Sequence, residues 1–434
     1  MNRLRKSVSL LVVLLTLSAL LLSAAVSAQE KVEIELWTFW GSETRRPIIE
    51  RIVEEFNNSQ DRIVVKHVYS PWGDIWTKTL AAVAAGDPPQ VVVNDINNVA
   101  LRAWKKQAMD LTPFIDDVEE FSSQFFPELW KTVVWEDGVY GVPFNTDTRF
   151  FMWNKDHFAE VGLDPEKPPT TWAELEEYAL KLDKIQGNRI ERLGFYPLFG
   201  NFGRDTWMIV GDNGVSWLDD EGNPRINTPH KVETLEWLIK WRERIGGRNV
   251  DAFQAEFGSQ AADPFISGKL SMMVNIANHY TQIRDYGQHL NVGYAPVPER
   301  EPGSGSWSWG GGFVLEIPYG AKHAEEAFEF IKWACGPEAQ RYWAVMNFDN
   351  VANIEGSYLA AEDERLSPEG QEVYRLSVEN LHWTIMTPVP HNLAGYMDLV
   401  NPQLDAAFLG VKSPQEALDQ AQRDVEEFIR NAEQ

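Results

Sequence analysis

The chain has 434 residues, of which 64 are acidic and 39 basic, giving a formal net charge of -25 at pH 7. The negative electrostatic potential of such a protein repels nucleic acids and anionic lipids, so the composition argues against a protein that binds either. Cys335 is the only cysteine, which excludes an intrachain disulfide and leaves stability to packing. This length is too great for one ordinary hydrophobic core and predicts two domains.

The first residues predict an export signal, residues 1–28. Three basic residues among the first six precede an apolar run at 8–26, and small residues end at Ala28. We expect cleavage after Ala28, which leaves a soluble periplasmic or otherwise extracytoplasmic protein. An uncleaved membrane anchor is the alternative, because the run is nearly long enough to span a bilayer. No cysteine stands at the cleavage site to carry a lipid anchor.

Strand and helix patterns alternate after this segment. Apolar and charged residues alternate at 32–36, and apolar residues recur at helical spacing at 48–56. The apolar run 63–65, a helical pattern at 72–83 and the wholly apolar run 91–93 continue the series. This repetition predicts a parallel sheet with right-handed crossovers, and therefore the α/β fold class.

The rest of the chain predicts a more helical middle and a second group of strands. Thr171 to Glu174 has the pattern of a capping box that opens a helix ending at Leu182. Further predicted elements are an acidic hairpin at 217–226, a helix at 230–244, strands at 270–274 and 292–295, a Gly/Ser/Trp loop at 302–312, and helices from 324 onward.

The familiar catalytic motifs are absent from the sequence. There is no Gly-x-Ser-x-Gly elbow, no His-Glu-x-x-His helix and no phosphate-binding loop, and no two of the eight histidines have metal-ligand spacing. We therefore expect no catalysis, no metal and no cofactor. A glycosidase remains the alternative, because its two carboxylates can lie far apart in the chain.

Tryptophan is abundant, with 18 residues. Aromatic faces pack well against the CH-lined faces of pyranose rings, although most tryptophans are expected to belong to the core. Four lie at predicted strand ends or in Gly-rich loops, where a side chain can face a cleft: Trp40, Trp207, Trp307 and Trp309.

Several short segments recur in an order typical of one family. They include Leu-Trp-Thr-Phe-Trp-Gly at 36–41, Ala-Ala-Gly-Asp-Pro-Pro-Gln-Val-Val at 84–92, Gly-Val-Tyr-Gly-Val-Pro at 138–143, Trp-Asn-Lys-Asp-His-Phe at 153–158 and Phe-Ile-Ser-Gly-Lys-Leu-Ser-Met-Met at 265–273. In order and spacing, the chain resembles the extracellular solute-binding proteins of ABC importers, in the sugar-binding branch that includes maltose-binding protein. The resemblance covers almost all of the expected mature chain.

This resemblance implies two α/β lobes, each a mainly parallel sheet flanked by helices, with the ligand cleft between them. The chain is expected to cross between the lobes near 143–145, near 295–298 and after 333. A solute that touches both lobes stabilises their closed arrangement, which the importer's permease can recognise. Lobe 1 is expected to comprise 29–144 and 297–335, and lobe 2 to comprise 145–296 and 336–434.

The resemblance also implies where the ligand contacts lie. Asp147 is expected to grip hydroxyl groups, with Arg149 on the same face of an extended chain. Relatives commonly have a tryptophan where this chain has Asn278, a departure that argues against a maltose-like ligand. The full expected set is Trp40, Ser42, Glu43, Asp95, Asn97, Asn98, Asp147, Arg149, Arg204, Trp207, Asn278, His279, Trp307, Trp309, Gly311, Gly312, His391 and Tyr396.

We therefore interpret the sequence as a monomeric receptor that binds a mono- or oligosaccharide and delivers it to an ABC transporter permease. Carboxylates and amides suit hydroxyl groups, aromatic rings suit sugar faces, and no dense cluster of Lys and Arg is present for phosphate. A receptor for another small polar solute, such as a polyol, glycerol phosphate ester or amine, is the nearest alternative. A secreted glycoside-active enzyme is the alternative from another class.

Overall fold

The computed structural model describes residues 31–432 except 188, 201 and 220. The expected signal peptide lies outside these residues. Within the described part of the chain, no helix combines the length and the apolar character needed to cross a membrane.

The larger of two main sheets has six strands in the order β14-β6-β13-β3-β1-β2. β1 (Val32–Thr38) pairs in parallel with β2 (Ile63–Tyr69) and β3 (Val91–Asp95), which confirms the parallel pairing predicted from the alternating pattern. β13 (Gly312–Glu316) runs antiparallel to β3 and to β6, and β6 also pairs antiparallel with β14. The bounds of the last two strands are Val142–Thr146 for β6 and Asn350–Val351 for β14.

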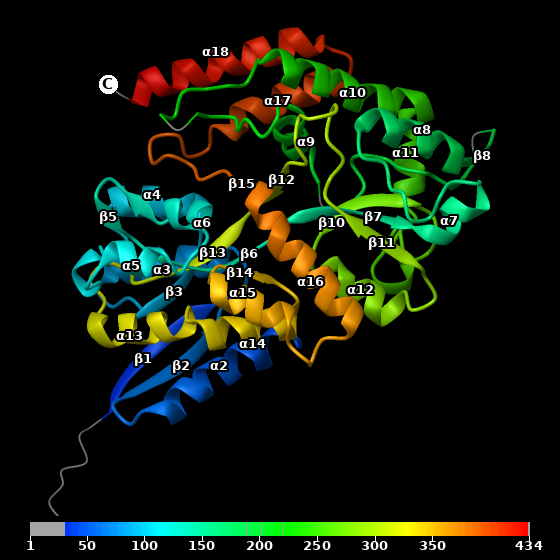
Figure 1. Cartoon of the computed structure of the whole chain (residues 1–434). Helices are drawn as coiled ribbons and strands as arrows, with labels where there is room; N and C mark the ends of the chain where they lie inside the picture. Colours follow the sequence, from blue (N-terminus) through cyan, green and yellow to red (C-terminus); the bar gives the residue numbers. More distant parts are fainter. Residues whose placement is uncertain (1–30, 188, 201, 220, 433–434) are drawn as a thin grey trace, which may run out of the picture.

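Helices cover both faces of this sheet (Figure 1). The helical spacing predicted at 48–56 is confirmed, because Ile48, Ile49, Ile52, Val53 and Phe56 are the buried residues of α2. The helices and short strands of this lobe are α2 (Arg45–Ser59), α3 (Asp74–Ala85), η1 (Ile96–Asn98), α4 (Val99–Trp104), η2 (Thr112–Phe114), α5 (Val118–Ser122), α6 (Pro127–Lys131), β4 (Val134–Trp135), β5 (Gly138–Val139), α13 (Ala324–Ala334), α14 (Pro337–Asn347) and α15 (Ile354–Ala361).

The second sheet has three strands, in the order β10-β7-β11. β7 (Arg149–Asn154) is its fully buried central strand and pairs antiparallel with both β10 (Met272–Ile276) and β11 (Val292–Ala295). The strands near 270 and 292 are therefore confirmed, but the expectation of a mainly parallel sheet in this lobe is wrong. An unbroken apolar run indicates burial on both faces and does not fix the direction of the neighbouring strands.

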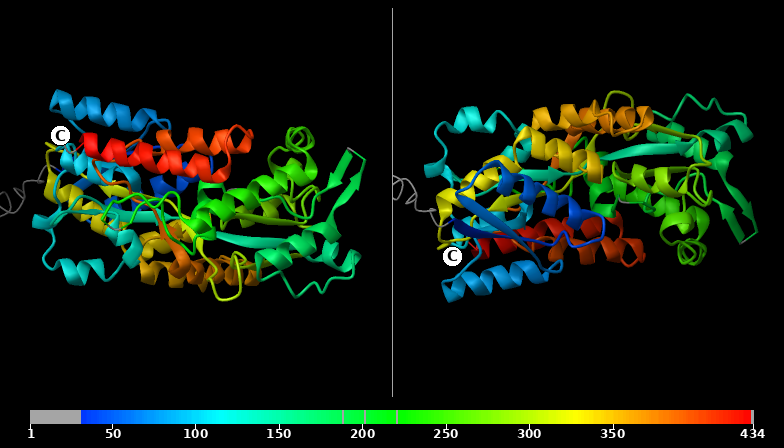
Figure 2. Two further views of the ribbon diagram at one scale, coloured as in Figure 1. Left: turned by 90° about the horizontal axis from the view of Figure 1, so that it is seen from above. Right: turned by 90° about the horizontal axis from the view of Figure 1, so that it is seen from below.

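Helices and hairpins surround the second sheet at the other end of an elongated molecule (Figure 2). The predicted capping box is confirmed, because Thr171 accepts from the Glu174 amide while the Glu174 carboxylate accepts from the Thr170 amide. The surrounding elements are α7 (Lys155–Glu160), α8 (Trp172–Leu182), β8 (Lys184–Gln186), β9 (Arg189–Arg192), α9 (Arg204–Gly211), α10 (Pro229–Ile245), α11 (Gly247–Gln254), η3 (Gln260–Ala262) and α12 (His279–Tyr286).

The last part of the chain contacts both sheets. α16 (Pro368–Asn380) packs against β7 and against α15, and is followed by η4 (Leu381–Trp383) and β15 (Thr384–Met386). β15 pairs in parallel with β12 (Ser308–Gly310). The final helices, α17 (Met397–Phe408) and α18 (Pro414–Ala432), pack on each other, and α18 also packs on α10 (Figure 1).

The chain passes between the two sheets three times. It does so at 147–148 between β6 and β7, at 296–311 between β11 and β13, and at 362–367 between α15 and α16. The third passage differs from the expected one after residue 333, because β14 joins the six-stranded sheet and α14 packs on α2. Residues 336–361 therefore lie with the first lobe in this structure, not with the second.

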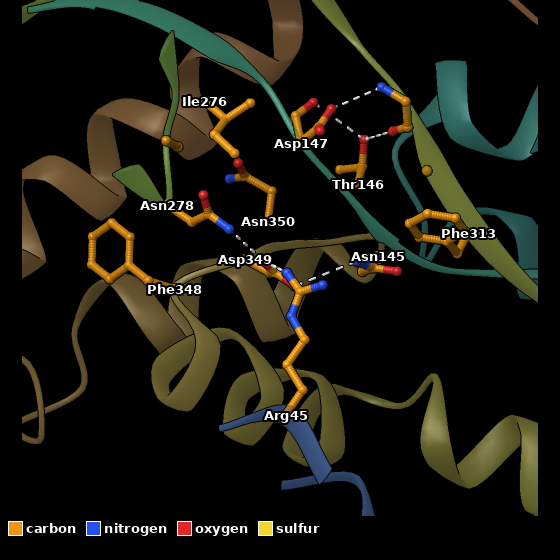
Figure 3. Close-up of a pocket in the computed structure, with 13 residues that line it drawn as sticks. Arg45, Asn145, Thr146, Asp147, Ile276, Asn278, Phe313, Phe348, Asp349 and Asn350 are labelled. Atoms are coloured by element: carbon orange, nitrogen blue, oxygen red, sulfur yellow. Dashed lines mark hydrogen bonds and ion pairs between the residues drawn. The ribbon is translucent and has the colours of Figure 1, made fainter. Parts of the chain in front are cut away.

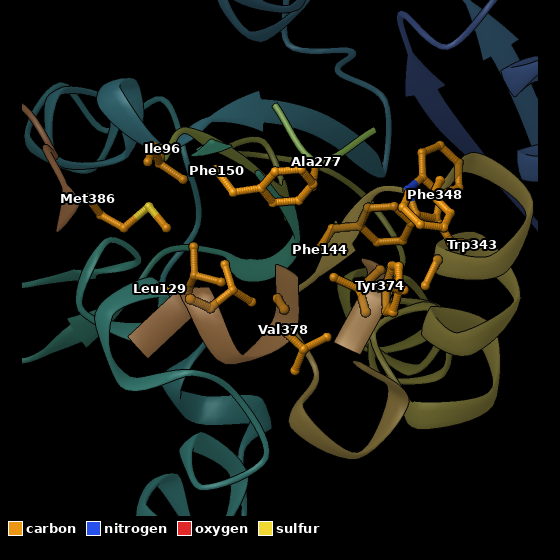
Figure 4. Packing of buried hydrophobic residues seen from close by; sticks show 14 of the residues in the cluster. Ile96, Leu129, Phe144, Phe150, Ala277, Trp343, Phe348, Tyr374, Val378 and Met386 are labelled. Atoms are coloured by element: carbon orange, nitrogen blue, oxygen red, sulfur yellow. The ribbon is translucent and has the colours of Figure 1, made fainter. Parts of the chain in front are cut away.

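A shared apolar core lies beneath the passages. Phe144, Trp343 and Phe348 from the first lobe lie in one cluster with Phe150 of β7 and Tyr374 of α16 (Figure 4). Because this core spans both sheets, the strand ends that emerge from it are held in a defined relative position. A second cluster lies among α9, α10, α17 and α18.

Candidate functional site: a polar cleft between the two sheets

A polar cleft opens where the two sheets meet (Figure 3). Its walls are formed by the ends of β6, β10, β13 and β14, by the residues next to those ends, and by the first residue of α2. The lining residues are Arg45, Asn145, Thr146, Asp147, Ile276, Ala277, Asn278, Gly311, Gly312, Phe313, Phe348, Asp349 and Asn350.

Asp349 forms the centre of the cleft floor. Its side chain is 6% exposed, and its carboxylate accepts hydrogen bonds from Arg45 Nη2 at 3.1 and 3.2 Å and from Asn278 Nδ2 at 3.1 Å. The indole of Trp343 donates from below at 3.3 Å. Burial raises the pKa of Asp349, while the positive charge of Arg45 acts in the opposite direction.

The backbone at Asp349 is also fixed. Phe348 adopts a left-handed conformation with φ of 55° at the end of α14, which turns the chain sharply into β14. The hydroxyl of Tyr374, from α16, donates to the Asp349 carbonyl at 2.9 Å. These contacts hold the carboxylate toward the cleft.

Asp147 forms the second acidic group of the cleft, at the first passage between the lobes. Its carboxylate accepts from the Gly311 amide at 2.8 Å and forms an ion pair with Arg149. Thr146 donates to the Gly311 carbonyl at 2.7 Å, so two consecutive residues hold the loop before β13. The Asp147 side chain is 41% exposed, which leaves it accessible from the cleft.

Arg149 is held from behind by Trp309. Its guanidinium lies 4.5 Å from the centre of the Trp309 ring and donates to the Trp309 carbonyl at 3.0 Å. The Trp309 indole donates to Thr387 at 3.1 Å. Trp309 thus supports the cation that pairs with Asp147.

The charges of the cleft are balanced in pairs. Arg45 pairs with Asp349, and Arg149 pairs with Asp147. Nearby Asp95 has its pKa raised, chiefly by burial and in part by the negative charge of Asp147. The cleft therefore offers carboxylate oxygens, amide groups and backbone polar groups, a set suited to hydroxyl groups. Within the described ranges, no group of three metal-ligating side chains is arranged to hold an ion.

Four of the expected contacts line the cleft: Asp147, Asn278, Gly311 and Gly312. Others lie beside it without lining it. Ser42 accepts from the Arg45 amide at 3.1 Å at the start of α2, next to the exposed Glu43. Asp95 accepts from the Asn97 amide at 2.9 Å, and Asp95 pairs in register with Phe313. Asn98 ends the same short helix, η1.

The structure places two of the expected tryptophans in the core instead of at the cleft. Trp40 is 1% exposed and packs against Phe144 and Trp343. Trp207 is completely buried, and its indole donates to the Pro197 carbonyl at 2.7 Å. Trp40 lies just after the end of β1 and Trp207 lies within α9, and both side chains belong to the apolar core.

Other expected contacts have partners away from the cleft lining. His279 is buried against Asp263, with 3.0 Å between Nε2 and the carboxylate, and Tyr396 is buried in the cluster of C-terminal helices. The remaining placements are the Arg204–Asp405 ion pair, the Trp307 indole bonded to the Ser304 carbonyl, and His391 between Trp104 and Trp135.

The main residues missed by the sequence analysis are Arg45, Asn145, Phe313 and Asp349. Arg45 and Asp349 are 304 positions apart, so no local spacing connects them. The one local signal is three polar residues, Asn347, Asp349 and Asn350, at the end of a predicted helix. That signal predicts a turn and does not identify a binding site.

Residues 51–361 match the family described as bacterial extracellular solute-binding protein. The arabinooligosaccharide-binding protein of Bacillus subtilis (strain 168) is 24% identical over 438 residues, with 95% of this chain and 96% of that protein covered. The sn-glycerol-3-phosphate-binding periplasmic protein of Pectobacterium atrosepticum is 21% identical over 460 residues, with 100% of this chain and 99% of that protein covered.

Solved structures share the arrangement of the two lobes. CpMnBP1 with mannobiose bound has a TM-score of 0.75 and 28% identity, covering 91% of this chain and 100% of its own. A cyclic alpha-maltosyl-1,6-maltose binding protein from Arthrobacter globiformis also has a TM-score of 0.75, at 20% identity, covering 92% of this chain and 100% of its own. The α/β two-lobe fold class predicted from the sequence is thereby confirmed.

Proposed function

The chain belongs to the family of bacterial extracellular solute-binding proteins, and on this premise we propose that it is a carbohydrate receptor of an ABC importer. It binds a mono- or oligosaccharide between its lobes and delivers it to the membrane permease. It acts as a monomer outside the cytoplasm after removal of residues 1–28, and it performs no catalysis of its own.

The main support for this proposal is that the charged side chains of the cleft form ion pairs with each other. Asp349 and Asp147 present carboxylate oxygens, while their partners Arg45 and Arg149 are already neutralised by them. A neutral polyhydroxyl ligand can donate to these carboxylates and accept from the Asn278 amide without leaving a charge unpaired. CpMnBP1, solved with mannobiose bound, supports a carbohydrate as the ligand class.

A glycerol phosphate ester is the second candidate, because of the relative from Pectobacterium atrosepticum. A phosphate group requires cations that are available to it. Arg45 is the only positively charged side chain among the described residues that line this cleft, and it already forms an ion pair with Asp349. The cleft chemistry therefore favours the sugar.

Closure between the lobes is the proposed mechanism. The lobes comprise 31–146 with 312–361, and 147–311 with 362–432, so that Asn278 and Asp349 belong to opposite sides. A solute that bridges the two sides favours their closed arrangement by its difference in affinity for the two forms.

Thermal unfolding against a solute library tests the proposal. The library contains manno-, malto- and arabino-oligosaccharides, their monosaccharides, and sn-glycerol 3-phosphate. A saccharide present at 100 times its Kd adds about 2.7 kcal/mol to the unfolding free energy and raises the Tm. A shift with sn-glycerol 3-phosphate alone, or release of sugar from a bound glycoside, would contradict the proposal.

A further inference from the structure

We propose that residues 387–396 form a strap that links the two lobes through a contact made by the protein alone. The strap keeps a substantial fraction of the ligand-free molecules in the closed arrangement. It belongs to the second lobe, where it connects β15 to α17. The inference rests on the proposed function, closure of the lobes on a sugar, and specifies how the opening of that same cleft is controlled.

The strap contacts the first lobe through His391. The imidazole ring centre lies 5.4 Å from that of Trp104 in α4 and 5.7 Å from that of Trp135 in β4. The Trp135 indole also donates to His391 Nδ1 at 3.4 Å. Because α4 and β4 pack against each other, the two indoles form one platform on the first lobe. In Figure 1 the strap runs from β15 toward α4.

The first residue of the strap is held at the cleft. Thr387 accepts a hydrogen bond from the Trp309 indole at 3.1 Å. The same Trp309 ring lies 4.5 Å from the guanidinium of Arg149, which pairs with Asp147. The strap therefore begins beside an acidic group of the cleft and reaches from there to the first lobe.

The part of the strap that carries His391 has a fixed backbone. The Leu393 amide donates to the Pro390 carbonyl at 3.0 Å, which closes a turn around His391. Leu393 and Tyr396 are buried in the cluster among α9, α10, α17 and α18, and Gly222 lies beside Pro390 and Leu393. The second lobe thus supports this turn from below and from the side, so little conformational entropy is lost when His391 contacts the first lobe.

The platform on the first lobe is available for such a contact. Trp104 is the last residue of α4 and is 52% exposed, although large aromatic residues are usually well buried. Neither Trp104 nor Trp135 nor His391 is among the described residues that line the polar cleft. The three rings therefore join one lobe to the other and do not form part of the cleft wall.

A contact between the lobes favours the closed form whether or not a sugar is bound. Aromatic pairs of this kind change such a ratio of closed to open molecules by about two- to tenfold. Because the sugar binds to the closed form, a larger closed fraction lowers the apparent Kd by at most the same factor. The strap thus increases affinity without contacting the ligand.

Small-angle X-ray scattering of the ligand-free protein tests the strap directly. The proteins are the unmodified chain, His391→Ala, Trp104→Ala, the double variant and the control His289→Ala. His289 is an exposed histidine in the loop after α12 of the second lobe. Circular dichroism and unfolding midpoints verify that each variant folds.

We expect His391→Ala and Trp104→Ala to have a larger ligand-free radius of gyration than the unmodified chain. The double variant should match His391→Ala, because Trp104 acts through His391 and their effects are not additive. His289→Ala should keep the parental value. An unchanged radius in His391→Ala, or an equal increase in the control, would overturn the strap.

Calorimetric titration of the same proteins connects the strap with the proposed function. The probes are mannobiose, maltose, arabinobiose and their monosaccharides. We expect His391→Ala to bind the recognised saccharide about two- to fivefold more weakly than the unmodified chain. Parental affinity in His391→Ala would overturn the effect of the strap on binding. Absence of binding by every saccharide to the unmodified chain would overturn the proposed function instead, while the ligand-free scattering still decides whether the strap links the lobes.

Discussion

The side-chain amide of Asn278 donates a 3.1 Å hydrogen bond to the Asp349 carboxylate across the floor of the cleft. Asn278 follows β10 of the three-stranded sheet, whereas Asp349 precedes β14 of the six-stranded sheet. This bond is therefore a direct polar link between the two lobes (Figure 3). Arg45 holds the same carboxylate from the first lobe, so movement of the second lobe away from the first breaks the bond from Asn278.

Replacement of Asn278 by Ala should weaken saccharide binding about five- to tenfold, the effect of losing one hydrogen bond of about 1–1.4 kcal/mol. Asp349 keeps its ion pair with Arg45, so the fold should be retained. Calorimetry measures the change, with Asn291→Ala as the control, because the Asn291 amide contacts Asp156 within one lobe. Equal affinities for Asn278→Ala and the parent would show that the link does not contribute to closure.

Replacement of Asp147 by Ala should weaken saccharide binding tenfold or more, by about 1.4 kcal/mol or above, because a carboxylate accepts hydroxyl hydrogen bonds strongly. The change also frees the Gly311 amide, which Asp147 holds at 2.8 Å. Asp147→Asn separates these effects, since it retains an acceptor for Gly311 and loses the charge. Parental affinity in Asp147→Ala would mean that the ligand lies elsewhere.

Replacement of Trp309 by Ala should reduce affinity more than replacement of Trp307. The Trp309 ring supports Arg149 at 4.5 Å, whereas Trp307 packs against Trp383 and bonds to Ser304. We expect a loss of about three- to tenfold for Trp309→Ala, mediated by a less well fixed Asp147–Arg149 pair. A larger loss for Trp307→Ala would assign ligand contact to the other side of this loop.

The stability of the chain should fall as the pH falls from neutrality, with His157 as one cause. Burial, aided by the charge of Arg192, lowers its folded pKa from 6.5 to about 4. Between these values the unfolded chain binds more protons at this position, so folding stability is present above the unfolded pKa and is lost toward the folded one.

Urea unfolding at about pH 5 and about pH 7 measures this effect in the parent and in His157→Gln. Gln can still bond to Ser271, which lies 3.0 Å from His157 Nδ1. The difference in unfolding free energy between the two pH values should be smaller in the variant. An unchanged difference would assign the pH dependence to other groups.

Local patterns predicted the elements of the fold much better than the ligand contacts. Alternation at 32–36 and helical spacing at 48–56 depend on burial of one face, and the structure has β1 and α2 there. The direction of β10 and β11 relative to β7 depends on connections far apart in the chain, and it was predicted wrongly for that reason.

The cleft depends on still longer-range relationships. Arg45 and Asp349 meet only after α14 packs on α2, and nothing near either residue signals this contact. Residue type alone also misleads for tryptophan, since the same ring suits a core or a sugar. Trp40, which was expected at the cleft, is buried, whereas Trp72 is exposed.

Small-angle X-ray scattering with and without a saturating saccharide measures whether the two lobes close on the ligand. In the proposed mechanism a bound sugar contacts residues of both lobes, so we expect a smaller radius of gyration at saturation. Asp147→Ala at the same sugar concentration should show a smaller change. A radius of gyration that stays the same for the parent at saturation would contradict binding by closure of the two lobes.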